Sequence, residues 1–96
     1  MKPSEALSLG RDAVHRIARA YGIWNVRVFG SVARGEDAEG SDLDLLVEAP
    51  PGTTLLDLIG MQLEIEDLLG VPVDILTDEE LPPKVRARIC QDARAV

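Results

Sequence analysis

The chain has 96 residues, 46% of them hydrophobic and 28% charged, which fits one compact domain spanning residues 1–96 with no room for a second. Its formal net charge of −7 and its three aromatic residues argue against a polynucleotide-binding surface, because phosphates attract cations and bases stack on aromatic rings. A single cysteine, Cys90, excludes an internal disulfide and a cysteine-based zinc cluster.

The N-terminal segment predicts an amphipathic helix. Residues 1–14 lack the apolar core of a signal peptide, and no apolar run in the chain approaches a membrane span, so we expect a cytoplasmic protein. Ser4 is the expected N-cap of the helix and Gly22 its end; the apolar positions at helical spacing are Ala13, Val14, Ile17, Ala18 and Tyr21. His15 lies on the polar flank of this stripe, and no second histidine exists to share a metal with it.

Two strands and a second helix follow. Residues 25–29, NVRVF, alternate and are rich in branched and aromatic side chains, which predicts a strand. Residues 41–48, SDLDLLVE, predict another strand, which two prolines and a glycine end. Thr53 or Thr54 then caps a helix over residues 55–69, whose apolar side chains cover about half of its circumference. An arc this wide has to be buried by a second layer or by a partner.

The C-terminal part predicts one more strand and a closing helix. Gly70 ends the preceding helix, and residues 71–77, VPVDILT, predict a strand with Pro72 at its start or at a sheet edge. Residues 81–96 predict a helix with prolines in its first turn and an apolar face made by Val85, Ile89, Ala93 and Val96. The basic residues here are interpreted as a solvated helix face; they are Lys84, Arg86, Arg88 and Arg94.

This order of elements predicts a single small α/β domain, in which helices flank a mixed sheet of three or four strands. The strands at 41–48 and 71–77 are joined through a helix and should run parallel. The strands at 25–29 and 41–48 are joined by about a dozen residues and should run antiparallel. The end of the first strand and the starts of the other two then meet at one edge of the sheet.

Three aspartates are expected at that edge. Asp42 and Asp44 lie two residues apart on one strand, so their side chains share a face, with Cα atoms roughly 6.6 Å apart. Asp74, near the start of the parallel strand, should lie beside them. Carboxylates this close repel one another unless cations hold them, and Mg²⁺ prefers hard oxygen ligands with room left for water and phosphate oxygens. Two such ions clamp the attacking and leaving oxygens of a phosphoryl transfer.

A small polar loop follows the first strand at the same edge. Gly30 lets the backbone approach a phosphate closely, Ser31 adds a hydroxyl, and the N–H groups that open a short helix at SVARG can donate to a polyphosphate. Arg34 lies one helical turn from Ser31 and can reach the same group. Each of these residues alone is equally explained by a turn. Their occurrence together with the aspartates favours a nucleotide site.

The pattern of Gly30 and Ser31, ten residues, and then Asp42 and Asp44 resembles the signature of the DNA polymerase beta-like nucleotidyltransferase superfamily. The segment GSVARGEDAEGSDLDLLVE, the VDIL strand and the chain length are similar to its minimal nucleotidyltransferase branch, over nearly the whole chain. Members of that branch are usually antitoxins encoded beside a HEPN-domain ribonuclease toxin. One departure is Val32, where many relatives have an arginine; it predicts weaker phosphate binding with the metal ligands intact.

The resemblance implies a nucleotidyltransferase fold and an enzyme that transfers AMP from ATP to a hydroxyl of the toxin, expected to be a tyrosine, and so silences it. Asp42, Asp44 and Asp74 would be both the catalytic residues and the ligands of two Mg²⁺ ions. Asp74 would also take or orient the proton of the acceptor hydroxyl.

The resemblance also implies that Gly30, Ser31 and Arg34 hold the β and γ phosphates of ATP. The implied partner is the HEPN toxin, in a hetero-oligomer with this chain, with no direct contact to nucleic acid or membrane. A different class of function is a binding module that neutralises the toxin by covering it, without catalysis. A small-molecule nucleotidyltransferase is disfavoured, because such enzymes usually add a second domain, and a polymerase fails on charge and length.

Overall fold

The computed structural model describes all residues from 1 to 96. In chain order the elements are α1 (Pro3–Ala20), β1 (Trp24–Phe29), α2 (Gly30–Ala33), β2 (Leu43–Glu48), α3 (Leu55–Leu69), β3 (Val73–Thr77), the 3₁₀ turn η1 (Asp78–Glu80), α4 (Pro83–Asp92) and β4 (Arg94–Ala95). The domain is thus an α/β fold, as the sequence predicts.

The four strands form one mixed sheet in the order β3-β2-β1-β4. As predicted, β2 and β3 run parallel, and β1 and β2 run antiparallel. Phe29 pairs with Asp44 across one ladder, and Asp44 pairs with Asp74 across the other. The end of β1 and the starts of β2 and β3 therefore lie side by side at one end of the sheet.

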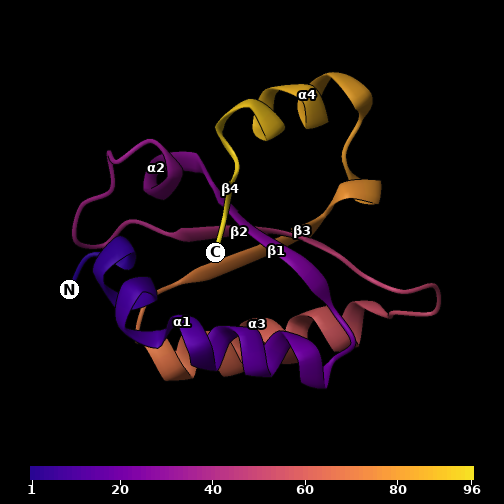
Figure 1. The fold of residues 1–96 in the computed structure, drawn as a ribbon, viewed down its shortest axis with the longest axis horizontal. Helices are drawn as coiled ribbons and strands as arrows, with labels where there is room; N and C mark the ends of the chain where they lie inside the picture. The colour runs from indigo at the N-terminus through magenta and orange to yellow at the C-terminus, as the bar shows by residue number, and fades with distance from the viewer.

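Helices cover the two faces of the sheet unequally. Figure 1 shows α1 and α3 packed side by side against one face, with α2 and α4 on the other. The hydrophobic core lies on the α1 and α3 side; its fully buried side chains include Val14, Leu43, Leu45, Val47, Met61 and Ile65. The alternation of β2 places Asp44 on the face that points away from this core.

The predicted bounds of α3 are confirmed at both ends. Thr54 is the N-cap, and its hydroxyl oxygen accepts a hydrogen bond from the backbone N–H of Asp57 at 3.2 Å. Gly70 follows the last turn in the left-handed conformation, with φ at 71°, which glycine adopts at little cost.

The start of α1 differs from the prediction. The helix begins at Pro3, so Ser4 lies inside the first turn and is not the N-cap. Proline favours this position because its missing N–H would have no partner in the first turn and its φ is already helical. Glu5 instead accepts a hydrogen bond from the backbone N–H of Lys2 at 3.0 Å.

The prediction of a helix through residue 96 is wrong. The helix ends at Asp92, and Arg94–Ala95 form a strand antiparallel to β1. The backbone N–H of Val96 donates to the carbonyl of Val26 at 3.0 Å, and the carbonyl of Val96 lies 2.9 Å from Nε2 of His15. The edge of β1 offers hydrogen-bonding groups that need partners, and satisfying them outweighs one more helical turn.

The outer side of α3 is not covered by any second layer of this chain. Met61 and Ile65 face inward and are fully buried, whereas most of the outward apolar residues are exposed; these are Leu55, Leu56, Ile59, Leu63 and Leu68. None of the helices combines the length and the apolar character that crossing a membrane requires.

Candidate active site

The sheet brings two of the three expected aspartates into register. Asp44 and Asp74 are direct partners in the parallel ladder, and each alternates with buried core residues, so both side chains point to the face away from α1 and α3. Asp42 precedes β2 by one residue and is exposed. The first carboxylate pair thus comes from two strands that are thirty residues apart in sequence, as Asp74 minus Asp44 gives.

Gly30 lies directly against Asp44. It stands at the end of β1 with φ at 71°, and a Cβ atom at this position would collide with Oδ2 of Asp44. Both the left-handed backbone and the contact therefore require glycine. The close approach brings the backbone that begins the Gly30–Ser31 loop to the carboxylate itself.

Electrostatics mark Asp44 as the most perturbed carboxylate of this cluster. Its pKa is raised above the ordinary aspartate value, first by burial and then by the charges of Asp74 and Asp42. Arg34 opposes this shift, so its guanidinium is close enough to act on the same carboxylate. The negative charge of the three aspartates exceeds the positive charge that Arg34 supplies, so this cluster attracts cations.

Arg34 lies at the end of α2 and is shared between acids. Its Nε donates to Glu36 at 3.1 Å, and its Nη1 donates to Asp92 of α4 at 3.5 Å. Arg34 is nearly half exposed, with a side-chain exposure of 45%, so these pairs are weak and the guanidinium can turn to a phosphate. Ser31 begins the same turn, and Val32 packs against the core, so the apolar residue there serves the fold.

The donor set fits Mg²⁺ without forming a closed cage. No three His, Cys, Asp or Glu side chains are placed to hold an ion together. Mg²⁺ is usually bound through one or two carboxylates and completes its shell with water and substrate phosphate oxygens, and the Asp44–Asp74 pair supplies that number. Ligation by Asp42, Asp44 and Asp74 together stays a prediction.

Two arginines make contacts between elements that were not predicted from the sequence. Arg94 of β4 donates from Nε to the carbonyl of Ala33 at 3.1 Å, which ties the C-terminal strand to α2. Arg86 donates from Nε and Nη2 to the carbonyl of Asp78 at 3.0 and 2.6 Å. The interpretation as a solvated helix face therefore leaves out these bonds, and Arg94, although exposed, lies in β4 and not in the helix. The partners of both arginines lie on other elements, so no spacing in the sequence reveals them.

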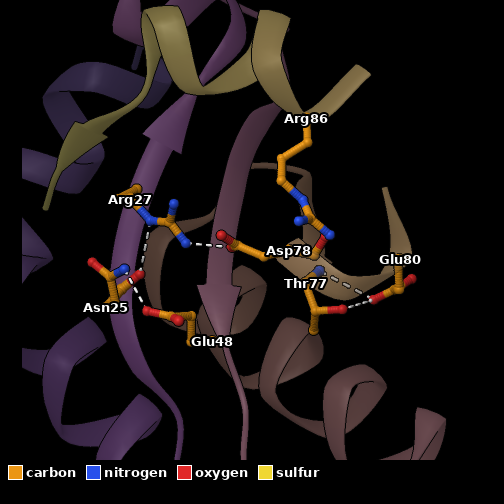
Figure 2. Close-up of polar contacts among 7 residues, drawn as sticks. All are labelled: Asn25, Arg27, Glu48, Thr77, Asp78, Glu80 and Arg86. Atoms are coloured by element: carbon orange, nitrogen blue, oxygen red, sulfur yellow. Dashed lines mark hydrogen bonds and ion pairs between the residues drawn. The ribbon is translucent and has the colours of Figure 1, made fainter. Parts of the chain in front are cut away.

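A second polar cluster lies at the far end of the strands. Figure 2 shows Arg27 of β1 directed at the carboxylate of Asp78, with Arg86 reaching the same residue from α4. Next to it, Asn25 donates to Glu48 at 2.6 Å. This cluster joins β1, η1 and α4, and it contains none of the predicted site residues.

Comparisons with known proteins place the chain in a family. A model described as "Nucleotidyltransferase domain" matches residues 11–96. A protein of Methanocaldococcus jannaschii named "Putative protein adenylyltransferase" is 42% identical over 73 residues, which cover 76% of this chain and 78% of that protein. "Protein adenylyltransferase MntA" of Thermococcus cleftensis is 33% identical over 72 residues, covering 75% of this chain and 73% of the relative.

Two solved structures share the fold. One, described as a "putative minimal nucleotidyltransferase", superimposes with a TM-score of 0.87 at 46% identity, over 97% of this chain and 95% of the other. A chain of a toxin-antitoxin structure with AMP-PNP superimposes with a TM-score of 0.77, over 88% of this chain and 69% of the other. At 15% identity, this second likeness concerns the fold alone.

Proposed function

This chain belongs to the nucleotidyltransferase domain family, and we propose that it is a protein adenylyltransferase that acts as an antitoxin, moving AMP from ATP to a hydroxyl of a partner toxin. The relatives named as protein adenylyltransferases support the reaction class. The shared fold with a toxin-antitoxin chain agrees with the antitoxin role.

One observation carries the proposal. Asp44 lies between Asp74 of the neighbouring strand and the close backbone of Gly30, on the face of the sheet that carries α2 and α4 (Figure 1). A carboxylate pair next to a glycine-containing turn offers negative ligands for a cation and a close backbone approach for a polyphosphate. A purely structural aspartate would instead be paired with a base or a cap, and Asp44 has neither among its hydrogen bonds and ion pairs.

The proposed step is an in-line displacement at the α phosphate of ATP. The acceptor oxygen forms a bond to the α phosphorus, the bond from that phosphorus to the bridging oxygen of the β phosphate breaks, and pyrophosphate leaves with the electron pair. Asp74 takes or orients the proton of the acceptor hydroxyl. The Gly30 backbone, Ser31 and Arg34 hold the β and γ phosphates, so positioning accounts for much of the rate.

Asp42, Asp44 and Asp74 are the residues proposed to hold two Mg²⁺ ions. Bound there, the metal would neutralise charge on the phosphates. The protein contributes the strand register, which keeps Asp44 and Asp74 adjacent, and the partly buried surroundings of Asp44, which strengthen its attraction for a cation.

The proposed partner is a HEPN-domain ribonuclease toxin, and the proposed acceptor is a tyrosine. An acceptor of this kind fits an open site, because a protein can supply its own wall where a small substrate would need a pocket. A tyrosine hydroxyl, with an ordinary pKa of about 10, needs the proton acceptor that Asp74 provides.

Mass spectrometry of the toxin after incubation with ATP and Mg²⁺ tests this function. We expect an added AMP mass on the toxin with the natural chain and none with Asp44→Asn. Asp12→Asn, on the exposed face of α1 and outside every hydrogen bond and ion pair, is the matched control and should transfer normally.

The second candidate function is neutralisation by binding alone. The exposed apolar side of α3 favours it, since that surface can hold a partner without any chemistry. If Asp44→Asn silences the toxin as well as the natural chain does, and no AMP mass appears, the binding module is the correct reading.

A further inference from the structure

The outer side of α3 carries a row of exposed apolar side chains, which we call the α3 stripe. It consists of Leu55, Leu56, Ile59 and Leu63, whose exposed fractions are 71%, 79%, 40% and 56%. Ile59 lies four residues after Leu55 and three after Leu56, and Leu63 lies four after Ile59, so all four fall on one side of the helix over its first two to three turns. Such a ridge matches the groove between side chains on another helix.

A cavity of about 670 Å³ continues the α3 stripe at its N-terminal end. Leu55 and Leu58 form part of its wall, and Trp24, which is half exposed, forms another part. The acidic residues of its lining are Glu48, Asp78, Glu79 and Glu80, and the lining includes no lysine or arginine. An apolar wall with an aromatic face and acids around it fits the stem and charge of a basic side chain.

Charge decides what the α3 stripe can receive. The helix contains four acidic residues and no basic one, and the acids are Asp57, Glu64, Glu66 and Asp67. In the cavity, Glu48 and Glu80 accept hydrogen bonds from the neutral residues Asn25 and Thr77, and neither glutamate makes an ion pair within the chain. A second copy of this chain would set these acids against each other, which disfavours self-association.

We propose that the α3 stripe and its end cavity form a docking surface for an amphipathic helix of a partner protein, one with an apolar stripe flanked by lysine or arginine. Leucine-like side chains of that helix pack between Leu56, Ile59 and Leu63. A basic side chain near its end enters the cavity beside Trp24, within reach of Glu48 and Glu79.

Docking and chemistry are separate in this arrangement. Figure 1 shows α3 in the helix layer on one face of the sheet. The alternation of β2 and β3 points Asp44 and Asp74 to the other face. The cavity is at the C-terminal ends of β2 and β3, and Glu48 of its lining lies four residues, or roughly 13 Å, beyond Asp44 along β2. That the docked helix belongs to the toxin rests on the proposed function; the docking surface itself does not.

A synthetic helical peptide tests the surface directly. The probe has about 18 residues, or roughly five turns, with leucine on one side, lysine on its flanks and no aromatic residue. Trp24 is the only tryptophan of the chain, so its fluorescence reports occupancy of the end cavity. We expect saturable binding that is at least about tenfold tighter than that of the same peptide with glutamate in place of lysine.

Substitutions on the α3 stripe separate docking from unspecific attraction to an acidic protein. Leu63→Glu adds negative charge, so it would strengthen an unspecific attraction for the basic peptide, but it should weaken docking about tenfold. Leu56→Ser, which adds no charge, should weaken it as well. Leu9→Glu on α1, where Leu9 is 78% exposed, makes the same substitution outside the α3 stripe; it is the matched control and should bind normally.

The possible results are decisive. Equal binding of the basic and acidic peptides, or unchanged binding by Leu63→Glu and Leu56→Ser, overturns the proposal. A natural chain that sediments as a dimer while Leu63→Glu is a monomer also overturns it, because a second copy then covers the surface. Asp44→Asn should bind the peptide normally while it loses AMP transfer. That result supports a docking surface that is separate from the active site. Absence of transfer by the natural chain would instead count against the proposed function alone.

Discussion

Acidic residues at the two ends of β2 differ in whether they have a hydrogen-bond or ion-pair partner within the chain. At the far end, Asp78 is joined to Arg27, and Glu48 is joined to Asn25 (Figure 2). At the near end, Asp44 faces Asp74 across the ladder, and neither makes an ion pair within the chain. The near end therefore costs folding free energy that the far end does not.

This difference separates a structural acid from a functional one. Paired acids such as Asp78 join elements and contribute to stability. Arg27 and Asp78 are both largely buried, with side-chain exposures of 15% and 26%. The pKa of Asp44 is raised mainly by burial and by its acidic neighbours, so its charged form gains nothing from folding. A fold retains such a residue when an external cation supplies the missing partner, and such perturbed groups gather at functional sites.

Asp44→Asn provides the largest test of this comparison. We expect AMP transfer to fall by roughly 10³-fold or more, because charge stabilisation at the reacting phosphate is lost. In EDTA, the melting temperature should not fall, because a raised carboxylate pKa means that the charge destabilises the folded state at neutral pH. A marked loss of stability in this variant would assign Asp44 to the structural class instead.

Arg27→Met tests the other end of the strand. The change keeps the aliphatic stem but leaves the partly buried Asp78 without its ion pair, so we expect a loss of about 1–2 kcal/mol in the free energy of unfolding. AMP transfer should change little. Arg88→Met, on the exposed side of α4, is the matched control in urea unfolding and should cost less than about 0.5 kcal/mol. Equal losses in the two variants would show that the far cluster contributes no specific stability.

Local signals were enough to predict much of the fold. The helix over residues 55–69 has a capping threonine, a terminal glycine and a periodic apolar pattern, and the structure reproduces its bounds. The strand directions followed from the lengths of the connections, and they place Asp44 beside Asp74 as expected. Both predictions depend on features contained within a short segment or on general rules of connection.

Contacts between distant segments could not be predicted in the same way. The last residues have helical periodicity, yet they form β4 because Val96 finds a backbone partner on Val26. Likewise, Arg27 and Asp78 are far apart in sequence, and no sequence pattern predicts that they form an ion pair. Tertiary hydrogen bonds override local propensity where an open strand edge offers unsatisfied groups.

Arg94→Ala tests whether the hydrogen bond from Arg94 positions the Gly30–Ser31 turn at the near end. Its guanidinium bonds the carbonyl of Ala33 and so fixes the turn that carries Gly30 and Ser31. Loss of one such hydrogen bond should cost about 1 kcal/mol, which we expect as an increase of about fivefold in KM for ATP with kcat nearly unchanged. Arg94→Lys retains a donor and should recover part of the loss. If both variants lower only the melting temperature, Arg94 is structural and does not position the loop.

Asp37 gives the smallest expected effect and tests whether a paired acid at the near end behaves like those at the far end. Its Oδ2 accepts the backbone N–H of Ser4 at 2.9 Å, and this hydrogen bond holds the pKa of Asp37 below the ordinary aspartate value. A depressed folded-state pKa means that the stabilisation is complete above the unfolded value of about 3.9 and is lost as the pH falls through the folded one. Asp37→Asn should therefore lower the melting temperature slightly at pH 7, and its difference from the natural chain should vanish once the pH falls below the folded-state pKa of Asp37. Asp12→Asn, which removes an exposed acid without a hydrogen bond, should show no such convergence because it should not differ at pH 7. A constant difference between Asp37→Asn and the natural chain at every pH would mean that shape, rather than the charge of Asp37, holds the loop to α1.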